Sequence, residues 1–585
     1  MLKTVVPESD PASLLHVLLM TEGTYPFHRG GVSTWCDALG HGMRGVRYTI
    51  LAVVMNPYVV PQYALPPSVE RVISVPLWGT QDPAEHRADL PFSQIFAKKQ
   101  RTTPDVVSEL FMPLFSELIA HLQRAEPDPE GFGQTLLGLY RYFHVYDYEL
   151  SFKSPAPWAH FRERLLAACA AGRWPAPTVF DMVQALGWVY RFMTILNIPV
   201  PSADLAHSSA AAFCGVSAIV AKLHHRTPYL LTEHGVYLRE QYLAVGRSDM
   251  GAFARSFLLA LVRTVVVANL YHADELAPVC HFNGRWERRL GAEPRKIRPV
   301  YNGVSPATFS LGPSATGAAA AAPVRIVSVA RMDPNKDIAT LLRAAAIVRE
   351  AEPRACFHVY GAVSVPDYHA RMLELRRELG LEEVVAFHDH TDDVAEVYRQ
   401  ADVLVQSSVT EAFPYAVIEG MMAGRPVVAT DVGGTAEAVG DAGILVPARE
   451  PALLAEALLR SIGDPALRAR LGVAARRRAL ELFTIDRTIA EFAAVYRRLA
   501  VLRPSAAPGQ VLELAVARAW ALHRLGRADL ARAQLDTALA RSEHSPATPA
   551  LLALRASLEG ALGNPEAQMF DLIRARILAD LQEAG

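Results

Sequence analysis

Two glutamates, Glu411 and Glu419, are separated by seven residues and have the chemistry of hydroxyl acceptors. One carboxylate can accept hydrogen bonds from two hydroxyls at once, which suits the neighbouring hydroxyls of a ribose or another sugar. A single glutamate is more often a solvated surface acid, because charged side chains are rarely buried. The pair is more informative, because the surrounding pattern is expected to bring both carboxylates to one edge of a sheet.

The elements around the two glutamates follow from the sequence of 402–437. Residues 402–406 form an apolar run that predicts a buried strand, and 407–413 form a polar loop. Pro414 suits the start of a helix, 415–423 have helical apolar spacing, and Gly424 is placed to end that helix. A second buried strand is expected at 426–430, with Gly433 and Gly434 opening the next helix. This is a βαβ unit, and open α/β sheets bind ligands at the carboxyl ends of their strands.

Two cations, Arg331 and Lys336, follow a strand expected at 324–330. An arginine fork and a compact lysine charge at a strand end suit a diphosphate. Asp333 and Asp337 lie between and beside them, so a local cluster of salt bridges is the rival interpretation.

Further loops are expected at the same edge. Gly361 ends a strand at 356–360, and a strand at 384–387 ends in a loop that contains His390 and whose backbone could read a uracil. Alternating His388 and His390 with nearby aspartates raise the idea of a metal site. We discount it, because no helical histidine pair or cysteine ligand accompanies them.

The N-terminal half offers two further candidates. Gly30 and Gly31 come after a strand at 14–20 and before a helix at 32–43, an arrangement that can bind an anion or simply turn the chain. His234 follows a strand at 228–232 and could contact a sugar hydroxyl or a phosphate, although a lone histidine is more often structural. Arg239 and Glu240 begin the next helix and are expected to line the same region.

The remaining pattern is that of an α/β protein with additions. Helical insertion is expected at about 82–177, and a small-residue linker at 312–323. The other predicted strands are 47–55, 204–207, 265–268, 275–279 and 296–301, and the other predicted helices include 179–194, 210–223, 338–350, 465–482 and a last one ending at 502.

Composition narrows the function class. The 585 residues carry a formal charge of −2, so nothing indicates nucleic-acid binding through a basic field. Five cysteines without a C-x-x-C pair fit a reduced, cytosolic protein. The first residues contain acids and prolines without a long apolar core, which does not match a signal peptide. The most apolar stretch, 256–270, contains Arg263 and is expected to be too short to span a bilayer, so we expect a soluble protein.

The tail after residue 503 is rich in alanine, leucine and arginine. Its two Leu-Gly pairs, at 525–526 and 562–563, lie 37 residues apart, close to the period of tetratricopeptide (TPR) helix pairs. Two units leave open a partner-binding module and a stabilising helical cap.

The stretch 402–437 resembles the E-x7-E signature of family 4 glycosyltransferases, which have the two-domain GT-B fold. The segments TEGTYPFHRGGVSTW at 21–35, TEHGVYLRE at 232–240 and RMDPNKD at 331–337 are similar to the PelF-like subgroup of Pel exopolysaccharide biosynthesis. The likeness covers about 14–502. It implies a Rossmann-like acceptor domain at 1–303, a Rossmann-like nucleotide-sugar domain at 304–484 and a helix crossing back at 485–503. The tail lies outside the likeness, and its repeat spacing alone predicts a TPR-like extension at 504–585.

The resemblance also implies roles. A UDP-sugar would donate a hexose or N-acetylhexosamine to a growing polysaccharide with retention of configuration and without a metal or other cofactor. Catalytic positions would be Arg331 and Lys336 at the diphosphate, Glu411 at the donor sugar, and His234. The nucleotide-sugar-binding positions would be Glu419 at the ribose, Gly30, Gly31, Phe413, Pro414, Gly433, Gly434, Thr435, Gly361 and His390. Ala330 departs from the glycine that many relatives have before the arginine.

Partners implied by the resemblance are the polysaccharide acceptor and membrane-bound synthesis or export proteins, which would contact the C-terminal helices of a cytoplasmic protein at the inner membrane. Two alternatives stay open: a non-catalytic scaffold of an export complex, and a GT-B epimerase acting on a free nucleotide sugar.

Overall fold

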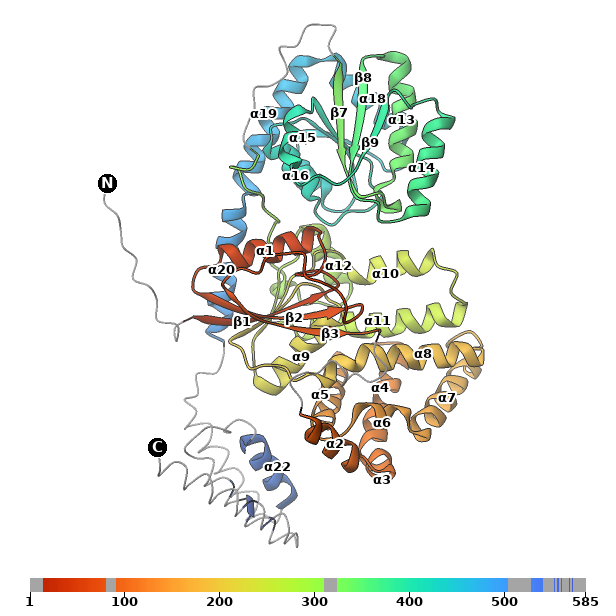
Figure 1. Cartoon of the computed structure of the whole chain (residues 1–585), viewed down its shortest axis with the longest axis vertical. Coiled ribbons are helices and arrows are strands. Elements are labelled where there is room, and N and C mark those ends of the chain that lie inside the picture. Colours follow the sequence, from red (N-terminus) through yellow and green to blue (C-terminus); the bar gives the residue numbers. More distant parts are fainter. Residues whose placement is uncertain are drawn as a thin grey trace, which may run out of the picture. The chain divides into compact units, whose positions relative to one another are not determined.

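The structure is a computed structural model that describes residues 14–79, 91–309, 323–502 and 528–539, together with positions 552, 555, 556, 559, 568 and 571. Contacts divide the chain into two compact units, Met1–Leu502 and Arg503–Gly585. The first unit contains two six-stranded sheets, which we call the N-terminal and C-terminal lobes together with the helices that cover them (Figure 1).

The N-terminal lobe has a parallel sheet in the order β3-β2-β1-β4-β5-β6. Its strands are β1 Leu15–Glu22, β2 Val46–Val54, β3 Val69–Pro76, β4 Leu205–Ser208, β5 Tyr229–Leu231 and β6 Glu275–Leu276. Most residues of β1, β2, β4 and β5 are buried, which explains why these strands read as continuous apolar runs. The strand order reverses between β1 and β4, so this lobe has a ligand-binding switch point at their carboxyl ends.

Helices cover the N-terminal sheet in two groups. Those that follow strands of the sheet or join them are α1 Gly31–Gly42, α9 Cys214–His225, α10 Tyr237–Gly246, α11 Ala252–His272 and α12 His281–Arg289, followed by the short η4 Pro294–Lys296. Those between β3 and β4 are α2 Phe92–Arg101, α3 Pro104–Val106, η2 Val107–Phe111, α4 Met112–Gln123, α5 Pro129–Val145, α6 Tyr148–Lys153, α7 Pro155–Ala170, α8 Val179–Phe192 and η3 Met193–Asn197.

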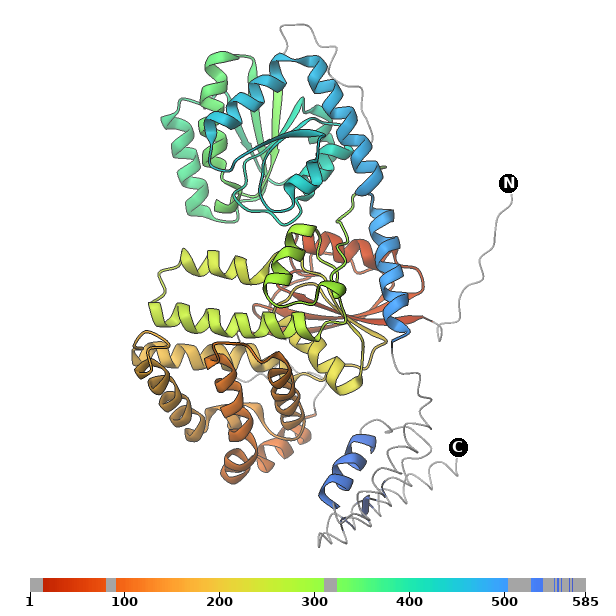
Figure 2. The same ribbon diagram turned by 180° about the vertical axis from the view of Figure 1, so that it is seen from behind.

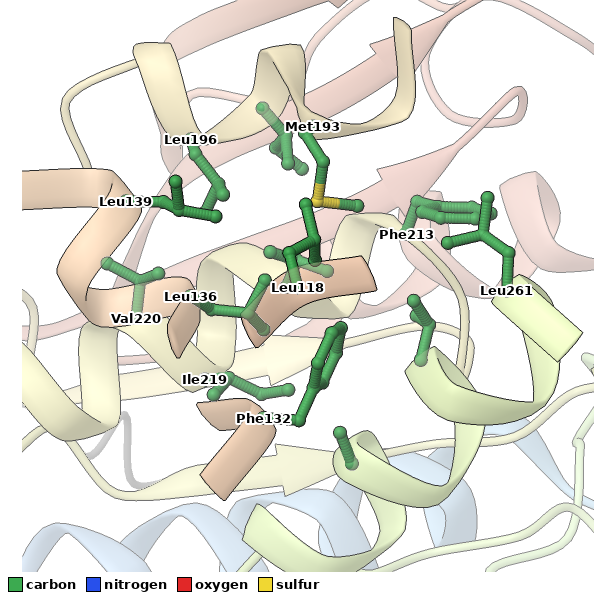
Figure 3. Packing of buried hydrophobic residues seen from close by; sticks show 14 of the residues in the cluster. Leu118, Phe132, Leu136, Leu139, Met193, Leu196, Phe213, Ile219, Val220 and Leu261 are labelled. Carbon is green, nitrogen blue, oxygen red and sulfur yellow. The ribbon is translucent and has the colours of Figure 1, made fainter. Parts of the chain in front are cut away.

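The helices between β3 and β4 share one hydrophobic core with the lobe. Leu118 of α4 and Phe132 of α5 are fully buried in the same cluster as Ile219 of α9 and Leu261 of α11 (Figure 3). The helices that the sequence predicted as an insertion therefore contribute much of the hydrophobic core of this lobe.

The C-terminal lobe repeats the topology of the first. Its sheet order is β12-β11-β10-β7-β8-β9, and all its pairs are parallel. The strands are β7 Val324–Val329, β8 Ala355–Tyr360, β9 Val385–His388, β10 Val403–Gln406, β11 Val427–Thr430 and β12 Gly443–Val446. The helices are η5 Pro334–Lys336, α13 Ile338–Ala351, α14 Pro366–Glu378, α15 Val394–Gln400, α16 Tyr415–Met422, α17 Thr435–Val439, α18 Pro451–Gly463 and α19 Pro465–Leu482.

Helix α20, Ile485–Ala500, follows α19 and packs on the N-terminal lobe (Figure 2). Phe492 and Tyr496 are buried in the cluster that contains Trp35, and the Tyr496 hydroxyl lies 2.8 Å from Nδ1 of His207 in β4. A C-terminal segment of the first unit thus belongs to the core of its N-terminal lobe.

Two strand predictions are wrong. Residues 265–268 lie inside α11, because β-branched valines there continue a helix whose whole face is buried in the core. Residues 296–301 form no strand; a short η4 turn and a single bridge between Leu276 and Ile297 take their place. In addition, β3 and β12 were not predicted.

Helix α11 is the only described helix that is long and apolar enough to cross a membrane. It has 21 residues, so the expectation that this segment is too short was wrong. Its most apolar 18-residue window is 61% buried inside the protein, as in the core helix of a globular lobe.

The α/β fold with two Rossmann-like sheets is confirmed. Gly424 adopts a φ of 71° after α16, as a glycine that ends a helix does, whereas Pro414 is the N-cap of α16 and Tyr415 is its first residue. The predicted linker at 312–323 lies almost wholly outside the described residues. So does most of the predicted TPR-like extension, of which α22, Ala528–Leu539, is described.

Candidate functional site

The site residues of the C-terminal lobe gather where its strand order reverses. The loop after β7 carries Arg331 and Lys336, and the loop after the neighbouring β10 carries Glu411. Parallel neighbours place their carboxyl ends at one edge, so loops that are 75 residues apart in sequence meet there.

Glu411 is held by three donors. Lys336 Nζ lies 2.5 Å from its Oε1, and Gln406 Nε2 and Ser408 Oγ donate to the same oxygen at 3.0 Å and 2.7 Å. The side chain is 11% exposed and that of Lys336 is 22% exposed. The second carboxylate oxygen accepts no hydrogen bond from the described residues and is available to a ligand hydroxyl.

Gly433 and Gly434 fix the loop that carries Glu411. The Gly434 N–H donates to the Ala412 carbonyl at 2.7 Å, and a Cβ at Gly433 would lie 1.6 Å from the Glu411 carbonyl oxygen. Gly433 has a φ of 61°, which a side chain also disfavours. The glycines are needed here for close backbone approach, and the five-residue α17 after them adds no anion site of its own.

Arg331 is exposed, and no hydrogen bond or ion pair engages it within the described part of the chain. The rival interpretation therefore fails for this residue. Asp333 accepts from the Asn335 N–H, and Asp337 caps α13 by accepting from the Thr340 hydroxyl at 2.7 Å. A cation without a counter-ion at a switch point is suited to bind an anionic ligand.

Gly361 permits the close approach of the loops after β7 and β8. A Cβ there would lie 2.2 Å from the carbonyl oxygen of Ala330, directly before Arg331. This glycine therefore shapes the backbone that presents the arginine.

Glu419 lies in α16 beside β10 and accepts a hydrogen bond from the Tyr398 hydroxyl at 2.9 Å. Burial raises the pKa of this carboxyl to about 7, and the Tyr398 bond opposes that rise. A carboxyl that is half protonated near neutrality is well suited to change its charge when hydroxyl donors arrive.

Other predicted residues of this lobe have structural contacts. Phe413 is 4% exposed, and its ring stacks on Tyr301 at 5.1 Å between centroids. Thr435 is fully buried, and its hydroxyl lacks a partner in the described ranges. His390 lies beside Asp392, 3.4 Å from its carboxylate.

In the N-terminal lobe, His234 packs edge-on against Trp35, with 4.5 Å between ring centroids. Burial lowers the pKa of His234 to about 3, so the ring is neutral, and its Nε2 has no partner in the described residues. A neutral imidazole can form a hydrogen bond with a ligand hydroxyl as donor or acceptor, but it has no positive charge to attract a phosphate.

The glycine loop of this lobe contacts the C-terminal lobe. A Cβ at Gly31 would lie 3.1 Å from the Tyr415 ring of α16, whereas one at Gly30 would meet nothing within 4 Å. Next to it, Arg29 forms an ion pair with Asp392 at 2.5 Å and lies 3.3 Å from His390.

The sequence did not indicate several contacts that join the lobes at this site. Arg239 of α10 donates to the Thr410 hydroxyl, directly before Glu411, and Arg247 donates to Asn335 at 2.9 Å. The Glu437 carboxylate accepts from the backbone N–H groups of His281 and Phe282, each at 2.7 Å. Each pair is separated by 88 or more residues, so no local pattern reveals it.

A second missed feature is a buried acidic pair, of which one member, Glu233, directly precedes His234 in the sequence. Glu233 and Glu287 are fully buried. Burial raises the pKa of both carboxyls, that of Glu287 to about 8. The negative charge of Glu287 further raises the pKa of Glu233. In the TEHG motif the sequence pointed to His234 as a site residue. That Glu233 is also unusual became clear only from its burial in the structure.

Among the described residues, no group of three or more histidine, cysteine or acidic side chains could hold a metal ion.

Two family models match the chain. Residues 323–464 match the model described as glycosyl transferases group 1, and residues 15–295 match a domain of unknown function, DUF3492.

Curated relatives are D-inositol 3-phosphate glycosyltransferases. That of Salinispora arenicola is 33% identical over 228 residues, which is 36% of this chain and 51% of the relative. That of Thermomonospora curvata is 37% identical over 177 residues, which is 28% of this chain and 41% of the relative. The chain thus spans about half the length of the curated relatives it matches.

Solved structures share the fold. Sucrose-phosphate synthase from Thermosynechococcus elongatus has a TM-score of 0.54 at 19% identity, covering 83% of this chain and 100% of that one. Anabaena HepE in complex with UDP has a TM-score of 0.51 at 15% identity, with the same coverage.

Proposed function

We propose that the chain transfers a hexose or N-acetylhexosamine from a UDP-sugar, with retention, to a growing exopolysaccharide of the Pel type. The match of residues 323–464 to the glycosyl transferases group 1 model supports the transferase class. The donor class is supported by the relatives named glycosyltransferases and by the UDP complex of a protein with this fold. The polysaccharide acceptor is supported by the motifs at 21–35 and 232–240 alone.

One observation carries the proposal. Lys336 contacts the carboxylate of Glu411 at the switch point of the C-terminal sheet, and Arg331, which makes no ion pair within the described residues, lies in the same loop as Lys336. Two cations and an acid at that edge match a ligand with a diphosphate at one end and sugar hydroxyls at the other.

The chemistry follows from these charges. When the bond between the anomeric carbon and the diphosphate oxygen breaks, the electron pair stays on the diphosphate and the sugar becomes oxocarbenium-like. Arg331 and Lys336 would stabilise the leaving charge as fixed cations, in the place that a divalent ion takes elsewhere. Glu411, oriented by its three donors, would hold a hydroxyl of the donor sugar.

Retention follows if the acceptor hydroxyl attacks from the face that the diphosphate leaves. Its proton then passes to the leaving phosphate oxygen, which balances the charge without a protein nucleophile. His234, being neutral, would position a donor-sugar oxygen by hydrogen bonding rather than by charge. Contacts such as that between Arg239 and Thr410 would exclude water from the reacting bond.

Calorimetry with UDP and a panel of UDP-sugars tests the proposal, followed by product analysis with the tightest-binding sugar. We expect UDP to bind, EDTA to leave the affinity unchanged, and sugar to appear in a polymer only when an acceptor is added. Absence of UDP affinity would contradict the proposal. Conversion of the UDP-sugar without acceptor would identify an epimerase, and UDP binding without any turnover would favour the scaffold.

A further inference from the structure

A pocket lies at the opposite edge of the C-terminal sheet, where β10 and β11 begin. Its volume is about 490 Å³. Asp402 precedes β10, residues 424–426 precede β11, and the rest of the lining comes from α19. Four-residue strands span roughly 13 Å, so the length of the strands separates the pocket from the edge that carries Glu411.

The walls of the pocket are fixed by close backbone packing. A Cβ at Gly472 of α19 would lie 2.3 Å from the carbonyl oxygen of Gly424, so the helix touches the turn that enters β11. Arg476 donates from Nη1 to the carbonyls of Phe309 and Met422, and Arg468 donates from Nη1 to those of Ser461, at 2.9 Å, and Ile462. The two arginines are therefore held in place by neutral acceptors.

The charge of the pocket is not balanced. Four arginines line it, namely Arg425, Arg468, Arg476 and Arg477, against the single acid Asp402. Asp402 already accepts from the backbone N–H of Arg325 at 2.8 Å, and in the described ranges no carboxylate lies within ion-pairing distance of any of the four arginines.

Arg425 is the strongest sign that the pocket binds an anion. It is 5% exposed, and its Nε is buried without a partner in the described chain, as is the Nε of Arg468. Burial lowers the pKa of Arg425, which Asp402 partly offsets. A buried guanidinium without a counter-ion is costly, and the cost falls when an anion binds to it.

The remaining wall is apolar and open to ligands. Val473 and Leu480 of α19 are 72% and 43% exposed, and both line the pocket beside the arginines. A ligand for such a site combines an anionic group with an apolar body, and the volume suits a small organic molecule. An excess of three positive charges fits a phosphate monoester, with up to two charges and three acceptor oxygens, better than a carboxylate.

We propose that this pocket is a second ligand site, which binds a small organic phosphate through Arg425 and Arg468 and the apolar part of the ligand through Val473 and Leu480. Neither the proposed sugar transfer nor the donor edge requires these residues. The site therefore adds a ligand class to the protein rather than a step to the reaction.

Calorimetry with phenyl phosphate tests the site in full-length protein saturated with UDP, so that the donor edge is occupied. We expect one site, with phenol, inorganic phosphate and benzoate each binding at least tenfold more weakly. The variants Arg425→Met and Val473→Glu should weaken phenyl phosphate binding at least tenfold, because they remove a charge-assisted bond or add a repelling charge.

The exposed Val501→Glu substitution on the end of α20 is the matched control, and it should leave binding unchanged. Because Val473 is mostly exposed, the Val473→Glu protein should fold normally. It therefore still tests the pocket if the Arg425→Met protein is unstable. No binding of phenyl phosphate, equal binding of benzoate, binding only when UDP is left out, or unchanged binding in both pocket variants would each overturn the proposal. If the protein did not bind UDP at all, the two pocket variants would still show whether phenyl phosphate binds at this site.

Discussion

Lys336 Nζ lies 2.5 Å from Glu411 Oε1, across two loops that end neighbouring parallel strands. The ion pair orients the carboxylate while its lysine stays partly exposed. Arg331, in the same loop as Lys336, makes no ion pair within the described residues. The Lys336 ammonium and the Glu411 carboxylate are thereby placed to contact the two ends of one ligand.

Removing the lysine charge should affect binding and turnover together. In Lys336→Met we expect UDP to bind at least tenfold more weakly and turnover to fall by about 10²–10³, since a preorganised cation at the leaving group is lost. Calorimetry and initial rates measure the two effects. Lys222 forms a similar ion pair with Asp274 at 2.7 Å, so Lys222→Met is the control and should keep full activity. Equal losses in both variants would indicate a general effect on folding.

A methyl group at Gly433 should displace the Glu411 loop. Its Cβ would lie 1.6 Å from the Glu411 carbonyl oxygen, so we expect Gly433→Ala to lower turnover by at least tenfold. Gly172 has a similar φ, 71°, but a Cβ there would meet nothing within 4 Å. Gly172→Ala should therefore lose about 1 kcal/mol of stability from backbone strain and keep its activity. Initial rates and thermal melts separate the two effects, and a fully active Gly433→Ala would refute the predicted displacement.

The affinity for a UDP-sugar, whose diphosphate has no proton that titrates near neutrality, should fall as the pH falls through about 7. Glu419 is protonated below its pKa of about 7, whereas two ribose hydroxyls are best accepted by the ionised carboxylate. Binding should therefore release a proton near neutrality, which calorimetry in two buffers of different ionisation enthalpy detects. Glu419→Gln should lose the pH dependence. Tyr398→Phe removes a hydrogen bond that lowers the pKa of Glu419, so it should shift the pH dependence of binding to higher pH. A pH-independent affinity in the unaltered protein would exclude this role.

Glu437 should stabilise the junction of α12 with α17. Its two oxygens accept from the N–H groups of His281 and Phe282 at 2.7 Å, and a glutamine offers only one acceptor oxygen. We expect Glu437→Gln to lower the free energy of unfolding by roughly 1–3 kcal/mol. Urea titration checks this against Glu456→Gln, a change on an exposed position of α18 that should be neutral. If both variants unfold alike, the junction contributes nothing measurable.

Much of the fold was predictable because its signals are local. Apolar runs such as 402–406 and 426–430 became β10 and β11, and Gly424 ended the helix between them. The failures at 265–268 and 296–301 have the opposite cause. Short apolar runs fit a buried helix as well as a strand, and only the surrounding core decides between them.

The sequence by itself determined the residue types and their order: strands that alternate with helices, cations after one strand, an acid after another, and glycines where backbones approach closely. It could not determine which loops meet, because contact depends on strand order, and strand order is set by packing over the whole sheet. The tertiary structure decided that Lys336 pairs with Glu411, that burial brings Glu419 to a pKa near neutrality, and that, among the described residues, neither the exposed Arg331 nor the buried Arg425 forms an ion pair.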